Sequence, residues 1–176
     1  LMGFHTGTDY YDLSEELDFV SWDNYPVWWN SPEVSYGAAA AADLMRGFKG
    51  KNFLIMEQTA GPCGWGIFSR NTRPGEIRKI CYQQLAHGAD GQIWFRWRSC
   101  TAGREQYWHG LIGHDGKALR RYNEAAQVAR EYRKLQDYLL GTTIESEIAI
   151  IYDFDSTWAL EFQPSFKGNN SQDAIR

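Results

Sequence analysis

Residues Asn52 to Gly66 read NFLIMEQTAGPCGWG, and this stretch decides how the chain is expected to fold. Its first half is a short, mostly apolar run, which is typical of a buried strand. The run ends at Glu57, after which Gly, Pro and Trp indicate a loop. A carboxylate at the exit of a buried strand is costly to desolvate unless it is paired or functional. Glu57 is therefore a candidate site residue, and the structural alternative is a salt bridge to Arg96 or Arg98.

The rest of the chain alternates between strand-like and helix-like segments. Apolar, β-branched and aromatic runs predict strands at 17–26, 52–57 and 91–98. Alanine-rich or helically spaced segments predict helices at 38–48, 73–87 and 118–140. The apolar face of the last helix is expected to hold Ala125, Val128, Ala129, Tyr132, Leu135 and Leu139. Apolar strands that alternate with helices imply an α/β fold, with a parallel sheet covered by helices.

A second unit is expected after Gly141. The run 148–154 (IAIIYDF) predicts a new strand, and Asp155-Ser156 predicts the start of a new helix. We therefore divide the chain into a first unit, 1–141, and the beginning of a second, 142–176. Because both ends of the chain look abrupt, we expect these 176 residues to be a piece of a longer protein. An incomplete sheet leaves an open edge and bare apolar faces, so we also expect the isolated chain to self-associate.

Composition narrows the possible partners and compartment. The net charge of −4 and a pI near 5.6 argue against nucleic acid or an anionic membrane as the main partner. No stretch approaches the roughly 20 apolar residues that span a bilayer. The three cysteines, Cys63, Cys81 and Cys100, lack the spacing of a metal site, and their odd number favours reduced thiols in the cytosol. We expect neither a metal nor an organic cofactor.

Polar residues are expected at the carboxyl ends of the three strands, the edge that carries the chemistry in parallel α/β barrels. They are Asp23 and Tyr25 after the first strand, Glu57 after the second, and Arg96 and Arg98 in or after the third, with Glu105 and His109 in the loop beyond. Several tryptophans also fall in loop-like segments: Trp28, Trp29, Trp65 and Trp108. Flat rings beside polar groups suit a sugar-binding cleft, although loop aromatics that fill the core would give the same pattern.

Five segments together resemble the bacterial β-galactosidases of glycoside hydrolase family 42. They are DFVSWDNYP, IMEQTAGPCGW, RPGEIRKICYQQLAHGADGQIWFRWR, EQYWHGLIGHDGK and AIIYDFDSTWAL, in the family's order and over nearly the whole chain. The resemblance implies about strands 5–8 of a (β/α)8 TIM barrel, followed by the start of an α/β domain that mediates trimerisation in the family. It implies a β-galactoside substrate and a homotrimeric, cytoplasmic enzyme without a cofactor.

The resemblance also implies roles for single residues. Glu57 matches the nucleophile of a retaining glycosidase, Trp65 a sugar-stacking tryptophan, and Glu105 a glutamate that binds galactose hydroxyls. Tyr25 is expected to orient Glu57, while Asp23 and Arg96 support the site. The family usually has Glu-x-x-His after that glutamate. Here Trp108 takes the fourth position and His109 follows, so either His109 makes the sugar contact or one hydrogen bond is lost.

The second carboxylate of the family's catalytic pair has no counterpart in this sequence. In the family it follows an Asn-Glu pair at the end of strand 4, whereas the Asn-Glu pair here, Asn123-Glu124, lies in the last predicted helix of the first unit. We therefore expect the acid/base and the N-terminal half of the barrel to lie outside this chain, which alone would be inactive. Two alternatives stay open: a related barrel glycosidase with another sugar specificity, and a non-catalytic carbohydrate-binding or assembly module.

Overall fold

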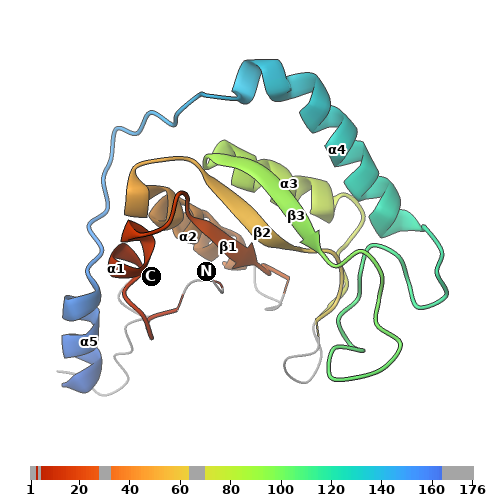
Figure 1. Ribbon diagram of the computed structural model, residues 1–176, viewed down its shortest axis with the longest axis horizontal. Helices are drawn as coiled ribbons and strands as arrows, with labels where there is room; N and C mark the ends of the chain where they lie inside the picture. The colour runs from red at the N-terminus through yellow and green to blue at the C-terminus, as the bar shows by residue number, and fades with distance from the viewer. Residues whose placement is uncertain (1–2, 4, 28–32, 64–69, 164–176) are drawn as a thin grey trace.

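The computed structural model describes residues 3, 5–27, 33–63 and 70–163 of the chain. Its elements run in the order α1 (Tyr10–Glu15), β1 (Ser21–Asn24), α2 (Val34–Lys49), β2 (Phe53–Thr59), α3 (Glu76–Ala86), β3 (Ala89–Phe95), α4 (Arg120–Leu139) and α5 (Phe154–Phe162). The three strands form one parallel sheet in the order β1-β2-β3, and α2 and α3 pack on one side of it (Figure 1). The predicted parallel sheet with helices between its strands is therefore confirmed.

The main core lies between α1, α2 and the helix-covered face of the sheet. It includes Trp22 of β1, Met45 of α2 and Phe53 and Ile55 of β2, all of which are buried. The alanine run of α2 presents small buried residues to the sheet, so the helix backbone can approach closely. The helix then ends at Gly50, whose φ of 60° is the left-handed conformation that glycine adopts at little cost.

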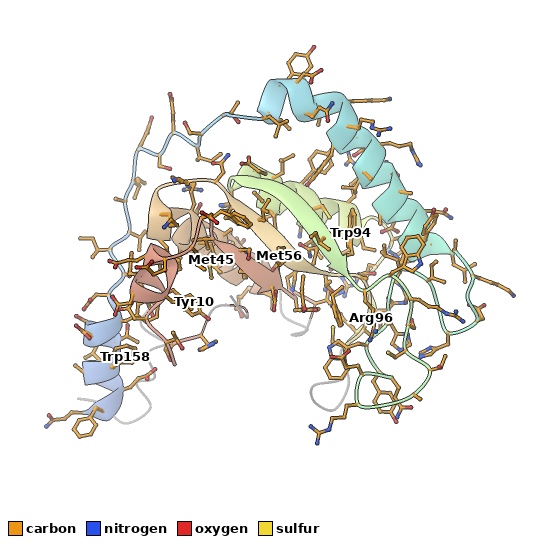
Figure 2. All side chains as sticks on the ribbon, viewed as in Figure 1. Tyr10, Met45, Met56, Trp94, Arg96 and Trp158 are labelled. Carbon is orange, nitrogen blue, oxygen red and sulfur yellow. The ribbon has the colours of Figure 1, made fainter. Side chains whose placement is uncertain are left out.

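The opposite face of the sheet is much more open. Met56 of β2 and Ile93 of β3 are 40% and 56% exposed, whereas Ile55, one residue earlier in β2, is fully buried. Figure 2 contrasts Met56 on the sheet with Met45 inside the core. Because successive side chains of a strand point to opposite faces, this apolar open face is what a sheet lining a barrel interior presents.

Helix α4 packs against α3 through a mixed apolar and polar contact. Val128 joins Ile77 and Cys81 in a small buried cluster, while Arg78 and the Tyr82 hydroxyl bind the Glu131 carboxylate at 2.9 and 2.7 Å. Ala129 was predicted to lie on the buried apolar face of this helix, and that prediction was wrong, because Ala129 is exposed. Since α4 contacts the rest of the chain along a narrow strip, only part of its apolar stripe is covered.

Two local features differ from the sequence-based expectation. Helix α1 was not predicted, although Asp9 caps it by accepting hydrogen bonds from the N–H groups of Tyr11 and Asp12. The predicted strand 148–154 was wrong: residues 144–153 form no strand, because no described segment pairs with them. In that segment Ile150 and Ile151 are 84% and 95% exposed. A helix does start where predicted, as α5, with its cap at Asp153.

Helix α5 returns to the opposite side of the molecule from α4 and lies beside α1 (Figure 1). The buried ring of Phe154 contacts the rings of Tyr10 and Phe48, and the Trp158 indole donates a hydrogen bond to the Thr6 carbonyl at 2.6 Å. Among the described helices, none combines the length and apolar character needed to cross a membrane. The division of the chain at residue 141 stays a prediction.

Candidate active site

The carboxyl ends of β1 and β2 bring three predicted site residues together. Asp23 and Glu57 are directly paired in the register of the parallel sheet, next to an irregularity between Trp22 and Asp23. Tyr25 follows β1, and its hydroxyl donates a 2.6 Å hydrogen bond to Glu57 Oε2. This hydrogen bond occupies one of the two carboxylate oxygens of Glu57. The predicted contact between Tyr25 and Glu57 is therefore present.

Behind these residues, a buried pair of amides holds the two strand ends in place. Asn24 Nδ2 donates to Gln58 Oε1 at 3.1 Å, and Gln58 Nε2 donates to the Asn24 carbonyl at 3.3 Å. Both side chains are at most 2% exposed. Each lies one residue after a carboxylate of the site, so the pair fixes the register from which Asp23 and Glu57 project. This pair was not predicted, although the acid–amide doublets Asp-Asn and Glu-Gln at the two strand ends were a usable signal.

The electrostatics of the site centre on the Glu57 carboxylate. Burial, together with the nearby Glu57 charge, raises the pKa of Asp23 to about 6. Burial and the hydrogen bond to Glu57 also raise the pKa of the Tyr25 hydroxyl, which therefore stays a donor. Burial and the nearby Glu57 charge also raise the pKa of the Cys63 thiol, to about 12. Cys63 is thus a neutral buried neighbour of the site, which the sequence analysis had treated only as a free cysteine.

Arg96 pairs with Glu105 and not with Glu57. Arg96 Nη1 lies 2.9 Å from Glu105 Oε2, at the carboxyl end of β3 where the loop 96–119 begins (Figure 2). Among the described residues, neither Arg96 nor Arg98 comes within 4.0 Å of the Glu57 carboxylate. The structural alternative for Glu57, a salt bridge to one of these arginines, was therefore wrong. Arg96 instead holds the glutamate for which the resemblance implies a sugar contact.

The loop 96–119 is fastened to the sheet by backbone hydrogen bonds. Leu111 N–H donates to the Arg96 carbonyl at 2.8 Å, and the Ser99 hydroxyl accepts from Gly110 N–H at 3.0 Å. A Cβ at Gly110 would lie 2.5 Å from the Arg96 carbonyl oxygen, so the close approach requires glycine. These contacts fix the point from which Glu105, Trp108 and His109 extend.

His109 connects this loop to the loop after β2. Its backbone N–H donates to the Pro62 carbonyl at 2.9 Å, five residues beyond Glu57. Its ring lies edge-on to His114, with centroids 4.9 Å apart. Burial, followed by the charges of Arg121 and His114, lowers the pKa of His109, so the ring is neutral at pH 7. Trp108 is half-buried beside it.

The tryptophans Trp28, Trp29 and Trp65 lie outside the described residues. Within the described part of the chain, no group of three or more His, Cys, Asp or Glu side chains is arranged to hold a metal ion. Among the described residues, Cys63, Cys81 and Cys100 form no disulfide bond. The described site is therefore a carboxylate with a tyrosine donor, next to a loop that carries a paired glutamate, a tryptophan and a histidine.

Comparisons with known proteins identify the family of the chain. The sequence model of glycoside hydrolase family 42, described as Beta-galactosidase, matches residues 1–135. Beta-galactosidase BgaA of Clostridium cellulovorans is 39% identical over 163 residues, which are 91% of this chain and 25% of that protein. Beta-galactosidase LacZ of Heyndrickxia coagulans is 36% identical over 162 residues, 92% of this chain and 24% of that protein.

Solved structures give the same result. The β-galactosidase from Bacillus circulans sp. alkalophilus matches with a TM-score of 0.85 and 39% identity, over 93% of this chain and 24% of that one. The β-galactosidase from the haloarchaeon Halorubrum lacusprofundi matches with a TM-score of 0.87 and 32% identity, over 97% of this chain and 27% of that one. The parallel sheet and its helices are part of the family's TIM barrel. The chain spans about a quarter of the length of the curated relatives it matches, and it belongs to glycoside hydrolase family 42, the family described as β-galactosidase.

Proposed function

We propose that this chain supplies the nucleophile side of a retaining β-galactosidase active site. The observation that carries the proposal is the 2.6 Å hydrogen bond from the Tyr25 hydroxyl to Glu57, at the carboxyl-end edge of a parallel sheet. A carboxylate that a tyrosine hydroxyl holds at this edge is placed to meet a ligand, and the family is one of glycosidases. This placement of Glu57 favours an enzyme over a purely structural module.

In this proposal, Glu57 attacks the anomeric carbon of a terminal β-D-galactoside and forms a covalent galactosyl ester. A second carboxylic acid, which we place outside these 176 residues, protonates the departing glycosidic oxygen. The same group then takes a proton from the water that hydrolyses the ester and releases galactose. Tyr25 orients Glu57 by holding one of its oxygens, so that the other is directed at the sugar.

The sugar contacts in the proposal come from the loops. Glu105, fixed by Arg96 at 2.9 Å, accepts hydrogen bonds from galactose hydroxyls. Trp65 stacks on the apolar face of the ring, as the resemblance implies. His109 is neutral at pH 7, so it offers both a donor and an acceptor and takes the place of the histidine that the family has one residue earlier. Trp108 shapes the cleft beside it.

The proposal extends to the setting of the protein. The complete enzyme would be a cytoplasmic homotrimer, with its cysteines reduced and the N-terminal part of the barrel as the immediate partner of this chain. The exposed apolar face at Met56 and Ile93 supports the last point, because such a face is normally covered. Another sugar specificity remains the main rival, because Trp108 departs from the family pattern.

A mechanism-based label tests the nucleophile directly. We define the completed enzyme as the Bacillus circulans relative in which this chain replaces the matching quarter. Incubation with a 2-deoxy-2-fluoro-β-galactoside that carries a good leaving group should add one fluorogalactosyl unit, and peptide mapping should find it on Glu57. The Glu57→Gln variant is the control and should stay unlabelled. Labelling by the corresponding glucoside alone would favour the rival sugar specificity, and a label on another residue would overturn the assignment of Glu57.

A further inference from the structure

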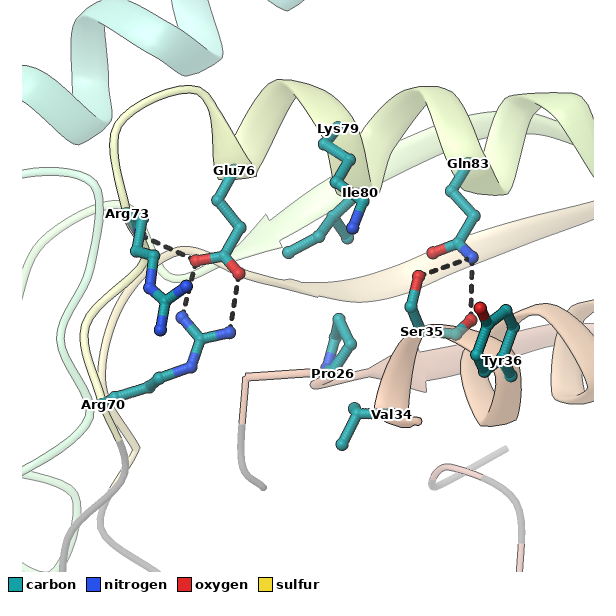
Figure 3. Close-up of a pocket in the computed structure, with 10 residues that line it drawn as sticks. All are labelled: Pro26, Val34, Ser35, Tyr36, Arg70, Arg73, Glu76, Lys79, Ile80 and Gln83. Atoms are coloured by element: carbon teal, nitrogen blue, oxygen red, sulfur yellow. Dashed lines mark hydrogen bonds and ion pairs between the residues drawn. The ribbon is translucent and has the colours of Figure 1, made fainter. Parts of the chain in front are cut away.

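A pocket of about 610 Å³ lies between the first turn of α2 and the helix α3 (Figure 3), and Glu57 is not among the residues that line it. Such a volume is typical of small-molecule sites. One of its walls is Pro26, which directly follows Tyr25. Since the Tyr25 hydroxyl binds Glu57, the backbone of Tyr25 and Pro26 links the pocket to the site described above. The mechanism proposed for Glu57 uses none of the other residues that line it.

The pocket has an excess of positive charge. Arg70, Arg73 and Lys79 line it together with a single carboxylate, Glu76. That carboxylate is already bound: Arg70 donates to both of its oxygens at 2.6 Å, and the backbone N–H of Arg73 donates at 2.7 Å. Burial opposes the ionisation of Glu76, but these donors outweigh it and lower its pKa, so the carboxylate is charged. One cation is thereby neutralised and two remain.

The other two cations form no direct ion pair within the described part of the chain, although the charge of Arg73 also helps to lower the pKa of Glu76. Among the residues that the structure describes, no carboxylate oxygen lies within 4.0 Å of the Arg73 guanidinium or the Lys79 ammonium. Two cations facing one cavity repel each other, and an anion bound between them would relieve that repulsion. The electrostatics therefore favour a negatively charged ligand.

The other lining groups favour a sugar as the carrier of that charge. Tyr36, at the rim, is 77% exposed and offers its ring face to solvent. Aromatic faces stack on the C–H face of sugar rings. Gln83 donates to the Ser35 carbonyl at 2.8 Å and to the Ser35 hydroxyl at 3.1 Å, leaving its amide oxygen as an acceptor for a ligand hydroxyl (Figure 3). A stacking ring, neutral hydrogen-bonding groups and two cations together suit an acidic saccharide.

We propose that this pocket binds an acidic saccharide, with a carboxylate or sulfate group between Arg73 and Lys79 and a sugar ring against Tyr36. The ligand is either a distal part of a galactoside bound at Glu57 or a separate acidic sugar. Both sources share the same chemistry, and the experiment below distinguishes them.

Ligand-observed saturation-transfer NMR on the completed enzyme tests binding, with D-glucuronate as the probe and excess galactose present to fill the catalytic site. Glucuronate should give a saturable signal and glucose should not. The double variant Arg73→Gln/Lys79→Gln should raise the Kd for glucuronate roughly 5- to 30-fold. This is the size expected for the loss of two solvent-accessible charge contacts. The matched control Arg130→Gln/Lys134→Gln removes two exposed charges from α4 and should leave the Kd unchanged. An unchanged Kd in the pocket variant, or an equal Kd for acetate, would overturn the proposal.

Kinetics then identify the source of the ligand. If the pocket holds part of the substrate, a galactoside of glucuronate should show a lower KM than lactose, and the pocket variant should remove the difference. If a separate acidic sugar binds, the two KM values should be equal while the NMR signal persists. This kinetic comparison rests on the proposed β-galactosidase activity, whereas the binding measurement does not. If the completed enzyme and all its variants fail to hydrolyse lactose, the result counts against the proposed function. If glucuronate does not bind specifically, the result counts against the proposed pocket.

Discussion

The two faces of the three-stranded sheet are built from neighbouring residues and have opposite characters. On the helix-covered face, Asn24 and Gln58 are buried and satisfy each other. One residue earlier in each strand, Asp23 and Glu57 are only half-buried, and each carries a carboxylate. Met56 is an extra residue in β2 at the shift in register, so Glu57 is paired with Asp23 and Gln58 with Asn24. From that point on, one step in sequence separates a group that holds the sheet together from a group available for chemistry.

The difference between the two faces explains how two neighbouring carboxylates, Asp23 and Glu57, are kept close together. Two carboxylates in direct register repel each other, which is one cause of the raised pKa of Asp23. The repulsion does not separate the strands, because the Asn24–Gln58 pair and the apolar core behind it fix their positions. The packing on the covered face thus stabilises the strands enough to keep the two carboxylates close together. Changes on the two faces should therefore have different consequences, activity on one and folding on the other.

The largest effect is expected at Glu57. In the completed enzyme, Glu57→Gln should lower kcat by about 10³-fold or more, because an amide cannot form the glycosyl ester. The thermal midpoint should stay within a few degrees of the parent protein, since Glu57 is not part of the buried core. Steady-state hydrolysis of lactose and a thermal melt measure both quantities. A variant that retains the parent kcat would show that Glu57 is not the nucleophile.

The next effect concerns folding and compares the two faces with a matched pair of isoleucines. Ile55→Ala empties a fully buried position and should lower the free energy of unfolding of the 176-residue chain by about 2–5 kcal/mol. Ile93→Ala, at a position that is 56% exposed, should cost less than about 1 kcal/mol. Guanidinium unfolding at two protein concentrations measures both and separates folding from self-association. Equal losses would mean that the open face is covered in solution.

The elements of the fold also differ in how well the sequence could predict them. The strand NFLIME and the helix that begins with the alanine run were predictable, because hydrophobic pattern and helix propensity are local properties. The run IAIIYDF was predicted as a strand with equal reason and forms none, because a strand depends on a partner that the pattern does not reveal. Helix α1 is short enough that its cap at Asp9 was its only clear signal.

For the site, the residue types were predictable and their pairings were not. The sequence indicated Glu57, Tyr25, Arg96 and Glu105, and the structure brings Tyr25 to Glu57 as expected. Arg96 binds Glu105 because the loop 96–119 folds back onto the end of β3, and Gly110 makes that return possible. No pattern in the sequence distinguishes this partner from Glu57, since both glutamates lie near the same edge.

A smaller effect on activity is expected at Tyr25. Tyr25→Phe keeps the ring but removes the donor to Glu57, a hydrogen bond to a charged group. Such bonds contribute about 1.5–3 kcal/mol, so kcat/KM of the completed enzyme should fall about 10- to 100-fold. Labelling by the fluorogalactoside should slow in proportion, because the same nucleophile is less well oriented. If kcat/KM is unchanged, Glu57 does not depend on Tyr25 for its orientation, and the two strand ends act independently.

The smallest effect tests the repulsion between the two carboxylates. The pKa of Asp23 is about 6 in the fold, above its ordinary 3.8, so the folded chain holds this proton more tightly than the unfolded chain. Ionisation therefore lowers the free energy of unfolding as the pH rises from about 4 to about 6, and the cost persists at pH 7. Asp23 is only half-buried, so solvent screening reduces this cost to about 1 kcal/mol.

Asp23→Asn should remove this cost, making the variant more stable than the parent at pH 7 and equal to it near pH 4, as measured by urea unfolding of the 176-residue chain. The control Asp18→Asn, in the exposed turn before β1, should change neither value. If Asp23→Asn instead destabilises the chain at pH 7, the carboxylate is held by attraction, and the strand ends do not store the repulsion that distinguishes them from the covered face.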